Sequence, residues 1–183
     1  MNPIIKSITD IFEKRGKDQY GVEEVNQLQH ALQCGLLAQN AKAKNQQIVA
    51  ALLHDIGHIY EGSHLPESLN GNFDDKHELR GNGWLKLHFG PEVADPIRLH
   101  VSAKRYLCTV DKTYESRLSP TSYKSYLDQG GPMSEEERAD FEKEPYYKEA
   151  LELRKWDDQA KDPNLQTPDF SHFILYLSNS IKQ

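Results

Sequence analysis

Hydrophobic residues recur along most of the chain at the three- and four-residue spacing of amphipathic helices. One apolar face spans residues 4–12, in a helix that ends near Gly16, and a second runs from Val25 to about Asn40. Residues 48–56 are apolar nearly all round, which is typical of a helix at the centre of a bundle. The pattern therefore predicts a helical core built around this third segment.

The rest of the chain continues the helical pattern. Further helices are expected at residues 77–87, 91–106, 119–127, from Ser134 onward, at 146–156 and at 170–181. Pro91 suits the first turn of a helix, and Ser134 with Glu137 has the form of a capping box, in a helix that Pro145 interrupts or ends. No alternating strand pattern persists for more than a few residues. The predicted fold class is all-α, as one compact domain over residues 1–183.

The longest predicted loop covers residues 62–75, which are rich in Gly, Ser, Asn and Asp. It lies between two helices that carry histidines. A mobile cover over a functional site would be useful at this place.

The length, charge and cysteine content of the chain limit the partners and the cellular environment that are expected for it. With 183 residues the chain has the length of one domain, and its net charge of −6 argues against a nucleic-acid partner. No apolar run approaches the roughly 20 residues of a membrane span. Cys34 lies in an apolar helical pattern and Cys108 is the only other cysteine, so a buried free thiol in a reducing cytoplasm is the simplest expectation.

Histidine is the unusual part of the composition, with eight in the chain. His54 and Asp55 end the strongly apolar segment, where an unpaired charge would be costly to bury. A metal ion would stabilise such a pair, since imidazole and carboxylate together suit zinc, iron or manganese. The alternative is that the two residues cap a helix and bond each other.

Three more histidines favour the metal. His30, His77 and His100 fall on separate predicted helices, each within or beside an apolar face. A single buried histidine is usually satisfied by the core, but four that point inward, with an adjacent aspartate, predict a metal site. His64, His88 and His172 have no such pattern and are interpreted as loop or surface residues.

The spaced histidines and the His-Asp pair resemble the HD-domain superfamily of helical metalloproteins. A closer likeness, over residues 20–161, is to the HD-domain mixed-valent diiron oxygenases that cleave 1-hydroxyphosphonates, notably those that form glycine. The segments that carry it are Asn26-Gln27-Leu28-Gln29-His30, residues 50–58, His100-Val101-Ser102-Ala103-Lys104-Arg105-Tyr106-Leu107 and Gln129-Gly130-Gly131-Pro132-Met133. The last two are the more specific, because His-Asp is common to the whole superfamily.

The resemblance implies two iron ions, Fe(II) and Fe(III), with O₂ as co-substrate. It implies that one iron is held by His30, His54, Asp55 and Asp157. It implies that the other is held by Asp55 as a bridge, His77 and His100, with open positions for substrate and O₂. Asp158 is the neighbouring candidate for the place of Asp157, which is preferred because it directly follows Trp156.

The same resemblance implies a substrate site. The residues expected to contact the phosphonate or to brace its surroundings are His58, Lys104, Ser122, Ser125 and Gln129. His58 would share a helix face with His54 if the helix continued past Asp55. Tyr20 and Glu23, three residues apart, are implied to sense a substrate amine, although Glu24 competes with Glu23 for that role. Without the resemblance, Lys104 would be interpreted as a surface lysine.

The implied reaction is oxidative cleavage of the C–P bond of (R)-2-amino-1-hydroxyethylphosphonate to glycine and phosphate. The same chemistry on the trimethylammonio analogue would give glycine betaine. Spaced histidines with a His-Asp pair would also suit a metal-dependent phosphohydrolase or a non-catalytic binding module. The expected partner is a small organophosphonate, with neither nucleic acid nor membrane.

Overall fold

The computed structural model describes residues 2–60 and 77–182, and the side chains of these ranges except those of residues 77–81. The predicted cover loop, residues 62–75, lies outside the described residues. Regular structure in the described ranges is helical, beside two isolated β-bridges, so the all-α prediction is confirmed. The helices are α1 Pro3–Arg15, α2 Gln27–Asn40, α3 Asn45–Leu53, α4 Ile56–Ile59, α5 His77–His88, α6 Pro91–Val110, α7 Lys112–Glu115, α8 Pro120–Asp128, α9 Glu135–Phe141, α10 Tyr147–Gln159, the 3-10 helix η2 Phe170–Phe173 and α11 Ile174–Ser180.

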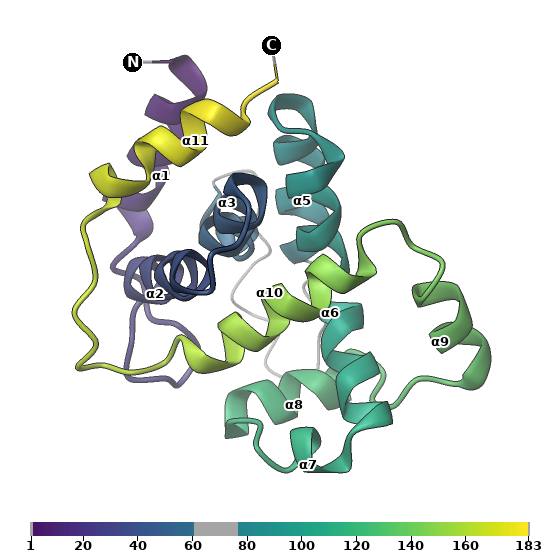
Figure 1. Ribbon diagram of the computed structural model, residues 1–183. Coiled ribbons are helices and arrows are strands. Elements are labelled where there is room, and N and C mark those ends of the chain that lie inside the picture. The colour runs from purple at the N-terminus through teal and green to yellow at the C-terminus, as the bar shows by residue number, and fades with distance from the viewer. Residues whose placement is uncertain (1, 61–76, 183) are drawn as a thin grey trace.

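Helix α3 forms the centre of the bundle, as its continuous apolar pattern predicts. Residues 48–53 are all buried, and α2, α6, α10 and α11 pack around them (Figure 1). Helices α1 and α11 lie side by side at the edge of this core, and both chain ends appear at the top of the view. The centre of the fold is therefore a helix whose C-terminal end, at Leu53, directly precedes the His-Asp pair.

Local capping explains where several helices begin. Asn26 and Gln29 form a capping box at the start of α2, and Ser134 and Glu137 form the box predicted for α9. Pro91 occupies the first turn of α6, which runs on to Val110, beyond the predicted end. The short helices α4 and α7 were not predicted, because a single helical turn carries too little periodicity to detect.

A glycine allows the C-terminal segment to approach the core closely. A Cβ atom built at Gly35 on α2 would lie 2.9 Å from a ring carbon of Phe173 in η2. Phe173 is fully buried, and Leu177 on α11 is buried beside it. The absence of a side chain at Gly35 thus permits η2 and α11 to close one side of the bundle.

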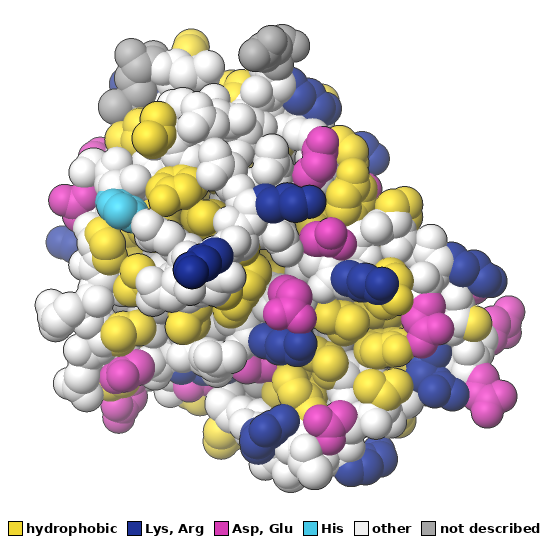
Figure 2. Space-filling model, in the orientation of Figure 1, with side chains coloured by type: hydrophobic (Ala, Val, Ile, Leu, Met, Phe, Trp, Pro, Cys, Tyr) yellow, Lys and Arg dark blue, Asp and Glu magenta, His cyan; other side chains and the backbone are white. Residues whose placement is uncertain are grey.

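The surface shown in Figure 2 mixes acidic and basic side chains, with apolar side chains between them. Among the described helices, none has the length and the apolar content that crossing a bilayer requires.

The packing of α11 can be tested with two leucines on that helix. Leu177→Ala is expected to lower the free energy of unfolding by about 2–5 kcal/mol, because the Leu177 side chain is fully buried. Leu175→Ala is the matched control, since Leu175 is 67% exposed, and it is expected to cost less than about 0.5 kcal/mol. Urea unfolding of the metal-free proteins measures both values. Equal values would contradict the described packing.

Candidate metal centre

The break between α3 and α4 positions the His-Asp pair. Helix α3 ends at Leu53, His54 caps it, and Asp55 precedes the first residue of α4. The helix predicted over residues 48–56 therefore ends earlier, at Leu53, and His54 and His58 do not lie on one continuous helix. The chain turns at Asp55, whose carbonyl oxygen accepts a hydrogen bond from the backbone N–H of His58 at 2.9 Å. This turn brings the adjacent His54 and Asp55 side chains into contact, with His54 Nε2 at 3.4 Å from Asp55 Oδ2.

His30 from α2 and Asp157 from α10 complete a compact group around this turn. His30 Nε2 lies 3.3 Å from His54 Nε2, 3.6 Å from Asp55 Oδ2 and 3.4 Å from Asp157 Oδ1. His54 Nε2 lies 3.6 Å from Asp157 Oδ2. Four of the predicted ligands, from three parts of the chain far apart in sequence, thus direct their donor atoms to one place.

His100 approaches Asp55 from the other side. Its Nε2 atom lies 3.7 Å from Asp55 Oδ1, whereas Oδ2 of the same carboxylate faces His30 and His54. His58 Nε2 is 4.0 Å from Oδ1 as well. The two oxygens of Asp55 therefore face two different groups of imidazoles, as a bridging carboxylate would require. His77 is the first residue of α5, and its side chain lies outside the described residues.

The orientation of the three imidazoles makes their Nε2 atoms acceptors. The Nδ1 atom of each of His30, His54 and His100 lies within hydrogen-bond distance of a backbone carbonyl oxygen, so Nδ1 carries the proton of the neutral ring. These carbonyl oxygens belong to Ala160, Ala51 and Ile97, at 2.8, 2.8 and 2.7 Å respectively. Unprotonated nitrogens facing one another and two carboxylates form a donor set that a metal cation fits.

The charges of this group shift its pKa values strongly. Burial lowers the pKa of His54, but the carboxylates of Asp55 and Asp157 outweigh burial and raise it to about 10. Burial raises the pKa of Asp157, yet Arg154 and His54 hold it well below its ordinary range. In the absence of metal, a proton on His54 thus takes the place of the cation, and metal binding displaces it.

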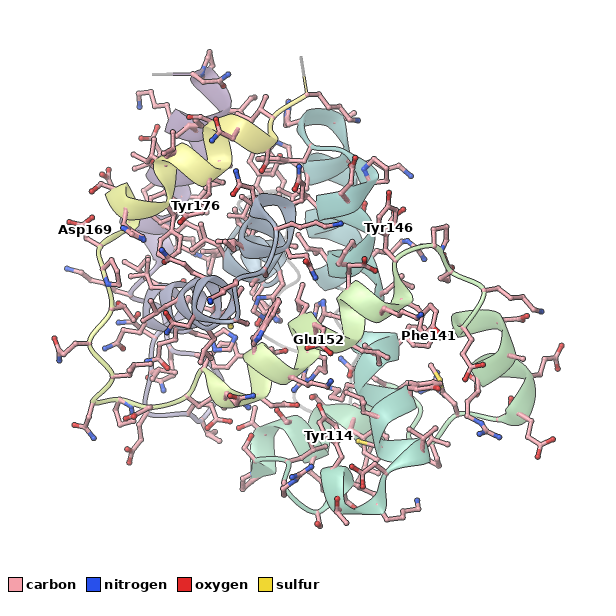
Figure 3. All side chains as sticks on the ribbon, viewed as in Figure 1. Tyr114, Phe141, Tyr146, Glu152, Asp169 and Tyr176 are labelled. Carbon is pink, nitrogen blue, oxygen red and sulfur yellow. The ribbon has the colours of Figure 1, made fainter. Side chains whose placement is uncertain are left out.

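Asp157 and Asp158 have different surroundings. Asp157 faces the imidazoles and accepts a hydrogen bond from Arg154 Nη1 at 2.6 Å. Asp158 instead bonds Arg154 and the hydroxyl group of Tyr114, which reaches α10 from α7 (Figure 3). Of the two aspartates that the sequence left as candidates, the structure brings Asp157 to the histidines.

Tyr20 and Glu23 lie in a loop rather than in a helix. The loop is closed by a bridge between Gln19 and Asn26, so the two side chains do not share a helix face. The Tyr20 ring stacks on His30, with 3.9 Å between ring centroids, and its hydroxyl donates to Asp157 Oδ1 at 3.4 Å. Burial, Asp157 and Asp55 raise the pKa of Tyr20 well above its ordinary value, so the phenol keeps its proton.

A cavity of about 430 Å³ opens beside the centre. Its lining includes the predicted ligands Asp55, His100 and Asp157, and six of the seven residues predicted to contact substrate: Tyr20, His58, Lys104, Ser122, Ser125 and Gln129. Glu23 is not among the described lining residues. Its carboxylate instead accepts hydrogen bonds from Ser119 Oγ at 2.6 Å and Lys161 Nζ at 3.2 Å.

Lys104 provides a buried cation in this wall. It is 3% exposed, and its ammonium group donates to Ser125 Oγ at 2.7 Å. Among the described residues, no carboxylate lies within salt-bridge distance of it. Burial and the nearby Arg154 charge lower the pKa of Lys104 to about 7. A buried ammonium whose partner among the described residues is a hydroxyl group favours an anionic ligand in the cavity.

Sequence reasoning did not find three residues of the site. Arg154 and Lys161 line the cavity, but charged side chains on an amphipathic pattern resemble solvent-exposed ones. Cys34 follows His30 by one helical turn, and its Sγ lies 3.7 Å from His30 Nε2, so that His30, Cys34 and His54 form a possible metal-binding group. Burial raises the pKa of the Cys34 thiol well above its ordinary value, which disfavours the thiolate form.

Comparisons with known proteins agree with this geometry. The model of the HD domain family matches residues 28–140. The chain is 43% identical over 178 residues to a protein of Gimesia maris named hydroxymethylphosphonate dioxygenase, covering 97% of this chain and 88% of the relative. It is 39% identical over 178 residues to the [1-hydroxy-2-(trimethylamino)ethyl]phosphonate dioxygenase (glycine-betaine-forming) of Leisingera caerulea, covering 97% and 90%.

A third relative is an uncharacterized protein of Acanthamoeba polyphaga mimivirus, 35% identical over 181 residues, with 96% of this chain and 83% of the relative covered. The family match spans most of the site, including His30, His54, Asp55 and His100. The chain therefore belongs to the HD-domain family, and within it groups with the dioxygenases of Gimesia maris and Leisingera caerulea.

Proposed function

We propose that this chain is a diiron oxygenase that uses O₂ to cleave the C–P bond of a 1-hydroxyphosphonate. The observation that carries the proposal is the position of Asp55, with one oxygen facing His30 and His54 and the other facing His100. This carboxylate lies at the wall of a cavity that also holds the buried Lys104. The names of two relatives give the same class of reaction.

Two sets of residues would hold the metal ions. The first ion is assigned to His30, His54, Asp55 and Asp157, and the second to Asp55, His77 and His100. The second set offers fewer protein ligands, which leaves coordination positions for substrate and O₂. Iron, as an Fe(II)/Fe(III) pair, supplies the activation of O₂ that this reaction needs.

The residues of the cavity would bind and orient the substrate. Lys104 and Ser125 present an ammonium and a hydroxyl group to the phosphonate, and His58 and Gln129 add polar side chains to the same wall. In the proposed reaction the hydroxylated carbon becomes a carboxylic acid and the phosphonate becomes inorganic phosphate. Both atoms of O₂ are accounted for in these products, so the reaction needs no external reductant.

The identity of the carboxylic acid depends on the group attached to the hydroxylated carbon. The family resemblance implies (R)-2-amino-1-hydroxyethylphosphonate, which gives glycine, and its trimethylammonio analogue would give glycine betaine. A metal-dependent phosphohydrolase would use the same ligands with water as the nucleophile. Consumption of O₂ separates the oxygenase from the hydrolase.

Admission of O₂ is the direct test of the oxygenase. Protein purified without O₂ and loaded with iron is expected to release phosphate from a 1-hydroxyphosphonate only after O₂ is admitted, with one O₂ consumed for each phosphate. Phosphate and O₂ are measured together, and the substrates are hydroxymethylphosphonate and 2-amino-1-hydroxyethylphosphonate. Release of phosphate under nitrogen would identify a hydrolase instead.

Replacement of the shared carboxylate tests the two-ion arrangement. Asp55→Ala is expected to abolish phosphate release and to lower the bound iron by about half, because three ligands remain for the first ion and only two for the second. Asp140→Asn is the control, since the Asp140 side chain is 67% exposed on α9. Iron content by metal analysis and turnover are measured for both proteins. Full turnover in Asp55→Ala would contradict the bridging role.

Lys104 generates a prediction about pH. Its folded pKa of about 7 lies below the unfolded value near 10.5, so its burial destabilises the protein below pH 7 and this penalty disappears as pH rises toward 10.5. Lys104→Met should therefore stabilise the metal-free protein at pH 6, with a smaller gain at pH 9. The free energy of unfolding of the variant and of the unaltered protein is measured with denaturant at pH 6 and at pH 9.

The same variant should raise KM for the phosphonate by about tenfold or more, since a charge-assisted contact is lost. Lys143→Met is the control, because the Lys143 side chain is 74% exposed and pairs with Asp140 on α9. A stability gain that does not depend on pH would contradict the stated cause.

A further inference from the structure

Glu23 is bound within the protein rather than presented to the cavity. Its Oε1 atom accepts hydrogen bonds from Ser119 Oγ at 2.6 Å and from Lys161 Nζ at 3.2 Å. The Glu23 and Lys161 side chains are only 15% and 11% exposed. Burial raises the pKa of Glu23, but the contacts with Ser119 and Lys161 outweigh it and lower the pKa. Glu23 is therefore an ionised carboxylate whose charge is already balanced by a lysine.

Lys161 is held in place by more than this ion pair. It also donates to Ser119 Oγ at 2.9 Å and to Ser122 Oγ at 2.8 Å. An ammonium group has three hydrogens to donate, and these three acceptors use all of them. Lys161 lines the cavity, and Glu23 is not among the described lining residues. Of the two members of this ion pair, the lysine is therefore the one that faces the cavity.

The other carboxylates in the described wall also have partners. Each of them faces a basic side chain, either on a neighbouring turn or within the metal centre. These pairs are Asp18 with Arg15 at 2.8 Å, Asp128 with Lys124 at 2.7 Å, Asp157 with Arg154 at 2.6 Å, and Asp55 with His54 at 3.4 Å and His100 at 3.7 Å. In this part of the wall a substrate ammonium group would thus meet only carboxylates that already face a basic side chain.

We propose that Lys161 determines the substrate specificity of the cavity. Its ammonium group neutralises the Glu23 carboxylate, so that the cavity selects 1-hydroxyphosphonates whose carbon chain carries no cationic group. This inference rests on the proposed function. Hydroxymethylphosphonate is the simplest member of the selected class, and its products would be formate and phosphate. Lys161 acts through Glu23 and Ser122, and it is a positioning residue.

The experiment compares two substrates in the iron-loaded protein. The unaltered chain is expected to turn over hydroxymethylphosphonate with a kcat/KM about tenfold or more above that for 2-amino-1-hydroxyethylphosphonate, because a cationic group meets no unpaired carboxylate. Lys161→Met, which releases Glu23, should lower KM for the aminated substrate and narrow this ratio by about tenfold, the effect of one partly buried charge pair. Lys161→Arg keeps the cation and should keep the ratio.

Lys155→Met is the matched control, because Lys155 is a half-exposed lysine on α10 that pairs with Glu152 at 2.7 Å. It should leave both turnover and ratio as in the unaltered chain. A preference of the unaltered chain for the aminated substrate would overturn this inference and leave the oxygenase intact. An unchanged ratio in Lys161→Met would also overturn it. Failure of both substrates to release phosphate with O₂ would instead overturn the proposed function, and this inference with it.

Discussion

The site depends on the mutual repulsion of buried acceptors that only a cation or a proton relieves. Three imidazole nitrogens and two carboxylates approach one another within 3.3–3.7 Å at the centre of the bundle. The imidazoles cannot easily turn away, because each Nδ1 is tied to a backbone carbonyl oxygen. Of the helices that contribute, α2, α6 and α10 all pack against α3. Binding of metal therefore stabilises the same helix contacts that form the core.

Arg154 connects the metal centre to the cavity electrostatically. It is buried, it neutralises Asp157 and Asp158 on its own helix, and its Nη2 lies 3.4 Å from Ser122 Oγ. Its charge also contributes to the low pKa of Lys104. An anion bound beside Lys104 would thus relieve repulsion between two buried cations. Arg154 is already paired with Asp157 and Asp158. A phosphonate would therefore stabilise the charge of Lys104 more than that of Arg154.

The sequence predicted those parts of the fold and the site that follow from apolar periodicity. His30, His54 and His100 could be assigned to the interior because each lies on or beside an apolar face, and their convergence follows from the bundle. The break after Leu53 could not be predicted, since Ile56 and Ile59 continue the helical spacing of apolar residues beyond it. The burial of a charged residue such as Arg154 could not be predicted from apolar periodicity, because it depends on partners that only the fold supplies.

Tyr20 and Glu23 show why a short spacing is a weak guide to recognition. Three-residue spacing joins two side chains only in a helix, and here the chain turns as a loop between them. Tyr20 stacks on His30, whereas Glu23 meets Lys161, which lies 138 residues away in sequence. Recognition of a cation depends on an available carboxylate, so it is a property of the Glu23–Lys161 pair and not of Glu23 alone. A site can therefore keep the glutamate and change its substrate through the distant lysine.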